Sequence, residues 1–251
     1  MELKTFFECH PRLALAFSGG ADSAYLLYAG QKWAQKLGVY YVHSTFQPAF
    51  ERRDAERLAK ELGVGMQILE ADVLGCPEIT ANPPDRCYHC KQVIMSTIRR
   101  QAALDGFDTV IDGTNASDDI GDRPGYKALG EQGVLSPLRL CGITKAEVRR
   151  LSRDAGLFTW DKPAYACLAT RVRTGEEITR EKLEAIEKSE DILFEMGFSD
   201  FRVRTAGDEA KLQFVAGQQP AARAREEEIR AVLSRYFGKI IIDPNEREAS
   251  V

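Results

Sequence analysis

The chain has 251 residues, a length that suits one large domain or a main domain with a smaller one. Hydrophobic residues make up 44% and charged residues 29%, a balance that excludes collagenous, disordered and membrane-spanning classes of protein. The formal net charge of −4 gives no overall attraction to nucleic acid or anionic lipid, so a small-molecule substrate is favoured.

The sequence carries no targeting or membrane signal that we recognise. No apolar run approaches the roughly 20 residues of a spanning helix. Glu2 and Glu8 occupy the region where a signal peptide needs positive charge followed by apolar residues. We therefore expect a cytoplasmic protein. Structural disulfides are rare in that compartment, so closely spaced cysteines there indicate metal or redox chemistry.

The first part of the chain alternates between short apolar runs and helical patterns. The run at 12–17 predicts a buried strand, and a small polar turn at 18–23 leads into an apolar-rich helix. Further strands are expected at 39–45, 64–70 and 108–112, with helices at 49–62, from about 91 to 104, and from the capping-box signal of Thr144 and Glu147 onward. This alternation predicts an α/β fold with a doubly wound parallel sheet.

The pattern changes after residue 180. A helix at 181–197, strands at 201–206 and 211–216, a helix at 221–238 and a strand at 239–243 predict a small α+β domain. The aperiodic segment 157–175 should connect the two parts. We place the domains at 1–165 and 166–251.

The turn at 18–23, SGGADS, lies between a strand and a helix, where backbone N–H groups and the helix dipole can hold an anion. Ser18 and Ser23 add hydroxyl groups, while Asp22 suits Mg²⁺ better than phosphate. The turn is neither a Walker loop nor a G-x-G-x-x-G loop. A turn that binds nothing is the alternative, but the strand-loop-helix context favours binding.

SGGADS resembles the SGG-x-DS loop of PP-loop ATP pyrophosphatases, which release pyrophosphate from ATP and leave an adenylated substrate. The segment 112–115, DGTN, resembles one found near the nucleotide in the same superfamily. His43, at a strand end, is expected to be structural. The resemblance implies Mg²⁺ at Asp22 and ATP at Ala16, Ser18, Gly19, Gly20, Asp22, Ser23, Ser44, Gly113 and Asn115.

Cys87 and Cys90 form a C-x-x-C pair that could bind a metal or act as a redox pair. His89 is badly placed to complete a zinc site, and there is no second C-x-x-C. Cys167, in the aperiodic segment, is the best third candidate, since three thiolates can hold a [4Fe–4S] cluster with one iron open to carry sulfide. The alternative is that all six cysteines are buried small apolar residues, which we favour for Cys9, Cys76 and Cys141.

The segments 82–91, NPPDRCYHCK, and 162–171, KPAYACLATR, resemble the cysteine segments of the LarE family. These PP-loop sulfur transferases make the nickel-pincer nucleotide cofactor of lactate racemase. The resemblance covers nearly the whole chain, including 121–125, 136–138 and 201–214, although Thr170 stands where the family often has Ser. It implies the three-cysteine type, with Cys87, Cys90 and Cys167 as catalytic residues and cluster ligands.

Arg202 and Arg204 alternate with apolar residues, so both guanidinium groups should project from one face of a strand. Two arginines on one face suit a phosphate or a carboxylate, although solvated surface charge is an equally open interpretation. The resemblance implies that this face binds the substrate's phosphate. It also makes Arg171 and Glu190 candidate substrate-binding residues.

The resemblance implies that ATP adenylates a carboxylate of pyridinium-3,5-biscarboxylate mononucleotide, with release of pyrophosphate. Sulfur carried by the cluster then attacks the acyl carbon, AMP leaves, and a thiocarboxylate results. The expected cofactors are ATP, Mg²⁺ and the [4Fe–4S] cluster. The expected partners are this small-molecule nucleotide substrate, further copies of the chain in a homo-oligomer, and an unidentified sulfide source, but no nucleic acid and no membrane.

Three other functions stay open. A tRNA thiolase of the same superfamily could use three cysteines, although the acidic charge balance and the lack of an evident basic RNA-binding domain oppose it. An ammonia-using PP-loop synthetase would leave the C-x-x-C pair unexplained. A non-catalytic nucleotide-binding iron–sulfur protein would bind ATP without releasing pyrophosphate.

Overall fold

The computed structural model describes residues 1–119, 121 and 124–248. The chain forms two compact units. The first comprises Met1–Val73 and Asp85–Lys162, and the second comprises Leu74–Pro84 and Pro163–Val251. Asp122 and Arg123, part of the segment 121–125 that entered the family resemblance, lie outside the described residues.

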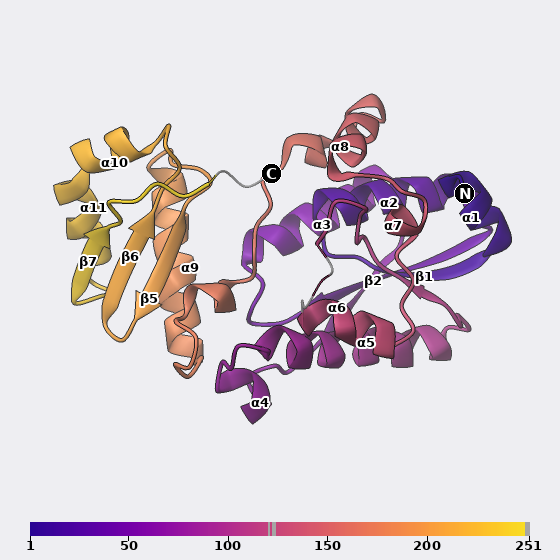
Figure 1. The fold of residues 1–251 in the computed structure, drawn as a ribbon, viewed down its shortest axis with the longest axis horizontal. Helices are drawn as coiled ribbons and strands as arrows, with labels where there is room; N and C mark the ends of the chain where they lie inside the picture. The colour runs from indigo at the N-terminus through magenta and orange to yellow at the C-terminus, as the bar shows by residue number, and fades with distance from the viewer. Residues whose placement is uncertain (120, 122–123, 249–251) are drawn as a thin grey trace. The chain divides into compact units, whose positions relative to one another are not determined.

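The first unit is built on a four-stranded sheet whose paired strands are all parallel (Figure 1). Its order is β3-β2-β1-β4, and Leu15 in β1 pairs with Val39 in β2 and with Ile111 in β4. The carboxyl ends of β1, β2 and β4 therefore meet at one edge, where ligands bind in open α/β sheets. The strands are β1 (Arg12–Ala16), β2 (Lys36–His43), β3 (Met66–Glu70) and β4 (Val110–Ile111).

Helices cover both faces of this sheet, as the predicted doubly wound architecture requires. Leu13 and Leu15 of β1 face one core, and Ala14 and Ala16 face the other, so the strand is apolar on both faces after Arg12. The first core contains residues of α1 (Leu3–Cys9), α2 (Ala21–Trp33), α3 (Ala49–Glu61), α7 (Pro137–Leu140) and α8 (Lys145–Asp154). The second contains residues of α5 (Arg86–Leu104) and α6 (Pro124–Glu131). The short helix η1 (Phe158–Asp161) packs against α8.

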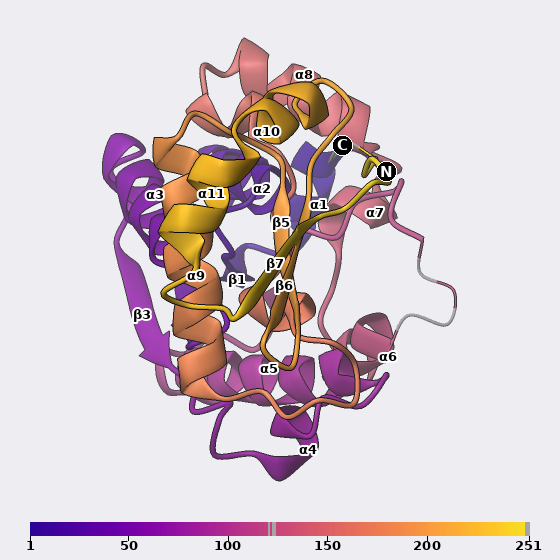
Figure 2. The same cartoon turned by 90° about the vertical axis from the view of Figure 1, so that its left-hand side faces the viewer.

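The second unit is the predicted small α+β domain, with a three-stranded sheet of order β5-β6-β7 (Figure 2). β5 and β6 are antiparallel, whereas β6 and β7 are parallel. Val203, Leu212 and Ile240 are buried on one face of this sheet. The elements are α4 (Pro77–Thr80), η2 (Leu168–Arg171), α9 (Arg180–Glu195), β5 (Arg202–Ala206), β6 (Glu209–Gln213), α10 (Gln219–Ala224), α11 (Glu226–Leu233) and β7 (Lys239–Ile242).

An early segment of the chain, Leu74–Pro84, belongs to this second unit because of Asn82. Asn82 is buried with φ of 52°, and its side-chain amide donates to the carbonyl oxygens of Val172 (3.3 Å) and Arg173 (2.9 Å). Its own carbonyl accepts the backbone N–H of Gly175 at 2.8 Å. These bonds hold the segment against residues that follow it by about 90 positions.

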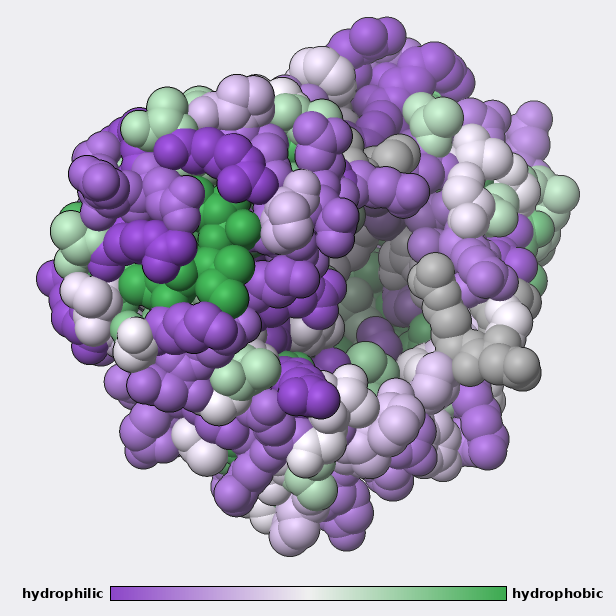
Figure 3. Space-filling view, turned by 60° about the vertical axis from the view of Figure 1, so that its left-hand side comes forward, coloured by the Kyte–Doolittle hydropathy of each residue, from purple (hydrophilic) through white to green (hydrophobic). Residues whose placement is uncertain are grey.

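Two sequence predictions need correction. The helix expected from about residue 91 begins at Arg86, so the C-x-x-C pair lies inside α5 rather than before it. The single helix expected at 221–238 is two short helices that meet at Arg225. Among the described residues, no helix is both long and apolar enough to cross a membrane, and most of the face in Figure 3 is hydrophilic.

Candidate functional site

The SGGADS turn leaves β1 and begins α2, with Gly20 at the N-cap of the helix. Ser23 Oγ lies 3.1 Å from the carbonyl oxygen of Gly20, to which it donates, and 3.0 Å from Ser18 Oγ. Gly19 has φ of +76°, and a Cβ atom there would lie 3.2 Å from the Cβ of Ala55 on α3. The turn is therefore held in one shape with its backbone at the start of a 13-residue helix, which can bind an anion.

The DGTN segment packs directly against this turn. A Cβ atom on Gly113 would lie 2.8 Å from the backbone nitrogen of Ser23, so any other residue would push the two segments apart. Asp112 is buried and accepts hydrogen bonds from Thr114 Oγ1 (2.6 Å) and Ser136 Oγ (2.7 Å), which fix the segment after β4. The predicted ATP residues at the ends of β1 and β4 thus lie side by side.

Asp22 is the charged centre of this region. Its carboxylate accepts hydrogen bonds from Asn115 Nδ2 (3.3 Å) and from Lys145 Nζ (2.7 Å). Burial raises the pKa of Asp22, while the ion pair with Lys145 acts in the opposite direction. A partly desolvated carboxylate in the first turn of a helix is suited to a bound cation such as Mg²⁺.

Lys145 is a residue that the sequence analysis missed. The predicted capping box of Thr144 and Glu147 is present, and Lys145 is the first residue of the helix that it begins. A cation at a helix N-terminus opposes the helix dipole. That unfavourable position was the available signal that Lys145 has a partner elsewhere, which the structure identifies as Asp22.

Ser44 and His43 lie at the end of β2. Ser44 is buried, and its hydroxyl and backbone N–H both donate to Gln47 Oε1, at 2.6 and 3.0 Å. His43 Nδ1 lies 2.8 Å from Glu70 Oε2 at the end of the neighbouring β3. The described contacts of Ser44 are therefore with its own loop. Ala16, the remaining predicted ATP residue, is buried at the end of β1.

Cys87 and Cys90 lie in the first turns of α5, and side chains three positions apart share one helix face. Arg86 Nη2 lies 3.5 Å from Cys87 Sγ. Cys87 also lines a cavity of about 350 Å³ with Lys91, Thr114 and Tyr126. Cys87 thus opens onto the same cavity as Thr114 of the DGTN segment.

The remaining cysteines differ in exposure. Cys9 is exposed, which corrects the expectation that it is buried, and Cys76 and Cys141 are half-buried. Cys167 is half-buried in the second unit. Within the described ranges, no three His, Cys, Asp or Glu side chains are gathered closely enough to hold a metal ion.

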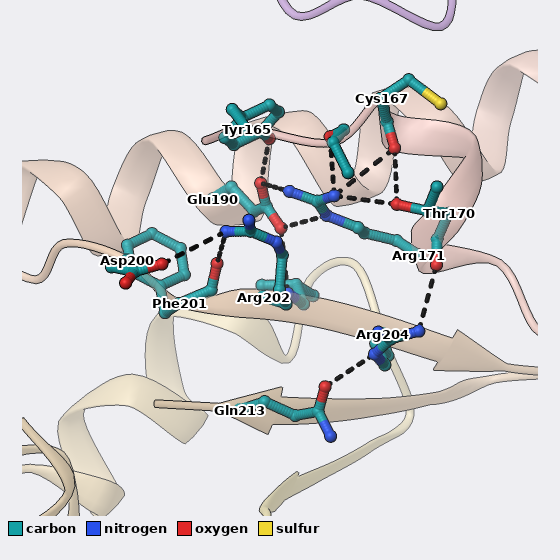
Figure 4. A network of polar contacts seen from close by, with 12 residues as sticks. Tyr165, Cys167, Thr170, Arg171, Glu190, Asp200, Phe201, Arg202, Arg204 and Gln213 are labelled. Atoms are coloured by element: carbon teal, nitrogen blue, oxygen red, sulfur yellow. Dashed lines mark hydrogen bonds and ion pairs between the residues drawn. The ribbon is translucent and has the colours of Figure 1, made fainter. Parts of the chain in front are cut away.

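In the second unit, Arg171 and Glu190 form a buried ion pair, each only 1% exposed (Figure 4). Arg171 Nε lies 2.9 Å from Glu190 Oε1, and Nη2 lies 3.3 Å from Oε2. Burial alone would lower the pKa of Arg171, but the ion pair outweighs it and the pKa is raised. Both residues were predicted to bind substrate, and the structure places both inside the unit facing each other.

Arg202 and Arg204 both contact the segment that carries Cys167. Arg202 Nη2 donates to the carbonyl of Ala164 at 2.9 Å, and Arg204 Nη1 donates to that of Thr170 at 3.2 Å. Burial, reinforced by the nearby Arg171 and Arg247, lowers the pKa of Arg202 to about 10. The pKa of Arg204 is lowered for the same reasons. This crowding of cations favours a bound anion.

Three known proteins have sequences similar to this chain over most of its length. No family model matches the chain. An uncharacterized protein of Synechocystis sp. is 36% identical over 213 residues, which cover 84% of this chain and 79% of the relative. The pyridinium-3,5-bisthiocarboxylic acid mononucleotide synthase of Lactiplantibacillus plantarum is 32% identical over 204 residues, covering 80% and 74%. An uncharacterized protein of Methanocaldococcus jannaschii is 26% identical over 232 residues, covering 92% and 89%.

Proposed function

Because the chain belongs to the LarE family, which includes pyridinium-3,5-bisthiocarboxylic acid mononucleotide synthase, we propose that it is an ATP-dependent sulfur transferase. Its proposed substrate is pyridinium-3,5-biscarboxylate mononucleotide, whose carboxylates become thiocarboxylates. The observation that carries this proposal is the packing of the SGGADS turn, the DGTN segment and Lys145 around Asp22. That arrangement supports the proposal, because it puts a turn suited to an anion, a carboxylate suited to a cation and a lysine ammonium group at one sheet edge.

In the proposed reaction, the turn and the start of α2 bind the phosphates of ATP, and Asp22 holds Mg²⁺. Lys145, which pairs with Asp22 in the structure, would neutralise charge on the departing pyrophosphate. A substrate carboxylate oxygen attacks the α-phosphorus, the bond to the β-phosphate oxygen breaks, and an acyl-adenylate forms. These residues contribute positioning and charge neutralisation rather than covalent chemistry.

We propose that Arg202 and Arg204 bind the phosphate of the substrate. Arg202 is buried and Arg204 is exposed, but desolvation and the nearby Arg171 and Arg247 lower the pKa of both. An anion at this place would offset the repulsion from Arg171 and Arg247. Arginine is also the side chain best suited to phosphate, because its fork of N–H groups matches two oxygens.

Cys87, Cys90 and Cys167 are the proposed ligands of a [4Fe–4S] cluster. The donor set fits this group in its chemistry, because thiolates are the usual ligands of iron–sulfur clusters and Cys87 and Cys90 lie one turn apart at the start of α5. Arg86, next to Cys87 Sγ, would offset the negative charge of the thiolates. When bound, such a cluster supplies an iron without a protein thiolate, at which sulfide can be carried. We also propose that an unidentified partner supplies the sulfide and that the chain forms a homo-oligomer.

The experiment that tests this function uses the full chain purified without oxygen. ATP, Mg²⁺ and pyridinium-3,5-biscarboxylate mononucleotide are added, and pyrophosphate, AMP and the thiocarboxylate product are measured. We expect pyrophosphate release that depends on this substrate, together with product. Release that depends instead on tRNA, or incorporation of labelled ammonia, would contradict the proposal, as would ATP binding without pyrophosphate release.

The cluster is tested separately by iron and acid-labile sulfide content. We expect about four irons per chain, lost when Cys87, Cys90 or Cys167 is replaced by Ala. Cys9→Ala is the matched control, because Cys9 is exposed on α1 and should leave the iron content unchanged. Absence of iron from reconstituted wild-type protein would remove the cluster from the mechanism and leave Cys167 as a sacrificial sulfur donor.

A further inference from the structure

Cys167 lies on a segment that has no regular secondary structure of its own from Lys162 until η2 begins at Leu168. Its shape is fixed by side chains. The carbonyl of Cys167 accepts hydrogen bonds from the backbone N–H of Thr170 (3.0 Å), from Thr170 Oγ1 (2.8 Å) and from Arg171 Nη1 (3.4 Å). Arg171 Nη1 also donates to the carbonyl of Ala166 at 2.7 Å and to Thr170 Oγ1 at 2.9 Å.

Arg171 can serve as this anchor because Glu190 holds it from the other side. The carboxylate of Glu190 accepts hydrogen bonds from two guanidinium nitrogens of Arg171 and from the backbone N–H of Val203 at 3.0 Å. One side chain therefore links α9, β5 and η2. A fork of this kind fixes the orientation of the guanidinium group as well as its position.

Tyr165 completes the arrangement from within the cysteine segment. Its hydroxyl donates to Glu190 Oε2, and burial together with that carboxylate raises the tyrosine pKa, so the hydroxyl stays protonated. Its ring lies 4.4 Å from the guanidinium carbon of Arg171 and 5.2 Å from that of Arg202. Figure 4 shows Tyr165 and Arg171 turned toward Glu190, whereas the sulfur of Cys167 points away from the network.

We propose that Arg171 and Glu190 are positioning residues that fix the backbone of Cys167, and thereby the direction of its thiol, rather than groups that touch substrate. Both side chains are only 1% exposed and are paired with each other, so they affect the reaction through the cysteine segment that they hold. The proposal rests on the proposed function only in taking Cys167 as the sulfur-handling residue.

The test compares Arg171→Lys and Glu190→Gln with wild type. Lysine keeps the charge but lacks the fork, and glutamine keeps the size but lacks the charge. The first measurement is the rate at which iodoacetamide alkylates Cys167 in cluster-free protein, followed by peptide mass spectrometry. We expect both variants to change this rate by about tenfold or more, because a loosened segment no longer holds the thiol in one direction.

The second measurement separates positioning from substrate binding. We expect kcat for thiocarboxylate formation to fall by roughly 100-fold, the usual consequence of a misplacement near 1 Å. KM for the nucleotide substrate and substrate-dependent pyrophosphate release should stay near wild type. Failure of pyrophosphate release in the wild type would instead count against the proposed function, and the alkylation measurement would still decide the positioning role.

General loss of stability is controlled with Leu233→Ala. Leu233 is fully buried on α11 in the same unit, and truncating it weakens the core by cavity formation. Cys167 in the Leu233→Ala variant should be alkylated at the wild-type rate at temperatures where both proteins are folded. Arg171 and Glu190 variants that alkylate like Leu233→Ala, or that raise KM with an unchanged alkylation rate, would overturn the positioning role.

Discussion

Replacing Gly113 by Ala should separate the two parts of the proposed nucleotide site. The φ of Gly113 lies outside the left-handed region, so its backbone accepts alanine, and only the new methyl group matters. That methyl would lie 2.8 Å from the backbone nitrogen of Ser23 and 3.2 Å from the carbonyl carbon of Asp22. Contacts between carbon and other heavy atoms are comfortable at about 3.5–4.0 Å, so the DGTN segment and the start of α2 must move apart by roughly half an ångström or more.

The cost of this change follows from what must move. Both neighbours are atoms of the peptide bond between Asp22 and Ser23, in the first turn of α2, so neither can rotate out of the way. Overpacking of this kind usually costs about 1–3 kcal/mol. For a chain of this length, each kcal/mol corresponds to a fall in Tm of about 2–4 °C. The Asn115 to Asp22 contact of 3.3 Å should be lost, and the affinity for ATP should fall with it.

The matched control is Gly130→Ala. Gly130 lies exposed in α6, and a Cβ atom there meets nothing within 4 Å. Alanine in that helix should be neutral or should stabilise by about 0.5–1 kcal/mol. Thermal unfolding and calorimetric titration with a non-hydrolysable ATP analogue measure both variants. A Gly113→Ala protein with wild-type Tm and wild-type ATP affinity would refute the close packing of the DGTN segment on the SGGADS turn.

Three other substitutions have defined outcomes. Lys145→Met should lower the rate of pyrophosphate release by about 10²–10³-fold if Lys145 neutralises the leaving group, and an unchanged single-turnover rate would exclude that role. Asp22→Asn should remove a pH dependence of stability. Because the pKa of Asp22 is raised, the free energy of unfolding of the wild type falls as the pH rises from the ordinary carboxyl pKa to the raised one. In urea unfolding without Mg²⁺, the stability of the variant relative to wild type should therefore increase over that pH window. Asn82→Ala should destabilise the second unit by about 1–3 kcal/mol, because two buried carbonyls lose their hydrogen-bond donor. Asn82→Gly relieves the strain of the positive φ but restores no donor, so calorimetry should show that it recovers only part of this loss.

The sequence was sufficient for the architecture because local signals agreed with one another. The strand before SGGADS is apolar from Leu13 to Ala16, on both of its faces, which indicates that helices cover both faces of the sheet, and the structure confirms this. The capping box at Thr144 and Glu147 is also present as predicted, with Thr144 Oγ1 accepting from the backbone N–H of Glu147. Each of these signals depends on residues within a few positions.

What could not be predicted depends on contacts between distant residues. The helix was expected from about residue 91, after the C-x-x-C pair, and nothing local indicated that α5 begins as early as Arg86. The helix that contains Glu190 is rich in charge, and its sequence does not distinguish the buried Glu190 from exposed neighbours. Burial of that carboxylate is tolerable because Arg171, 19 positions away, forms an ion pair with it and Tyr165 and Val203 donate hydrogen bonds to it. Lys145 was missed for the same reason, since its partner lies 123 positions earlier.

The placement of Leu74–Pro84 in the second unit affects how the protein could be divided into fragments. Residues 163–251 expressed alone would lack the carbonyls that accept the N–H groups of Gly175 and Ile178, both supplied by this early segment. A fragment made by simple truncation should therefore be poorly folded. Fusing the eleven residues 74–84 ahead of 163–251, or adding them as a peptide, should restore it. During synthesis on the ribosome, those residues must likewise wait for the intervening first unit to emerge before their own unit can form.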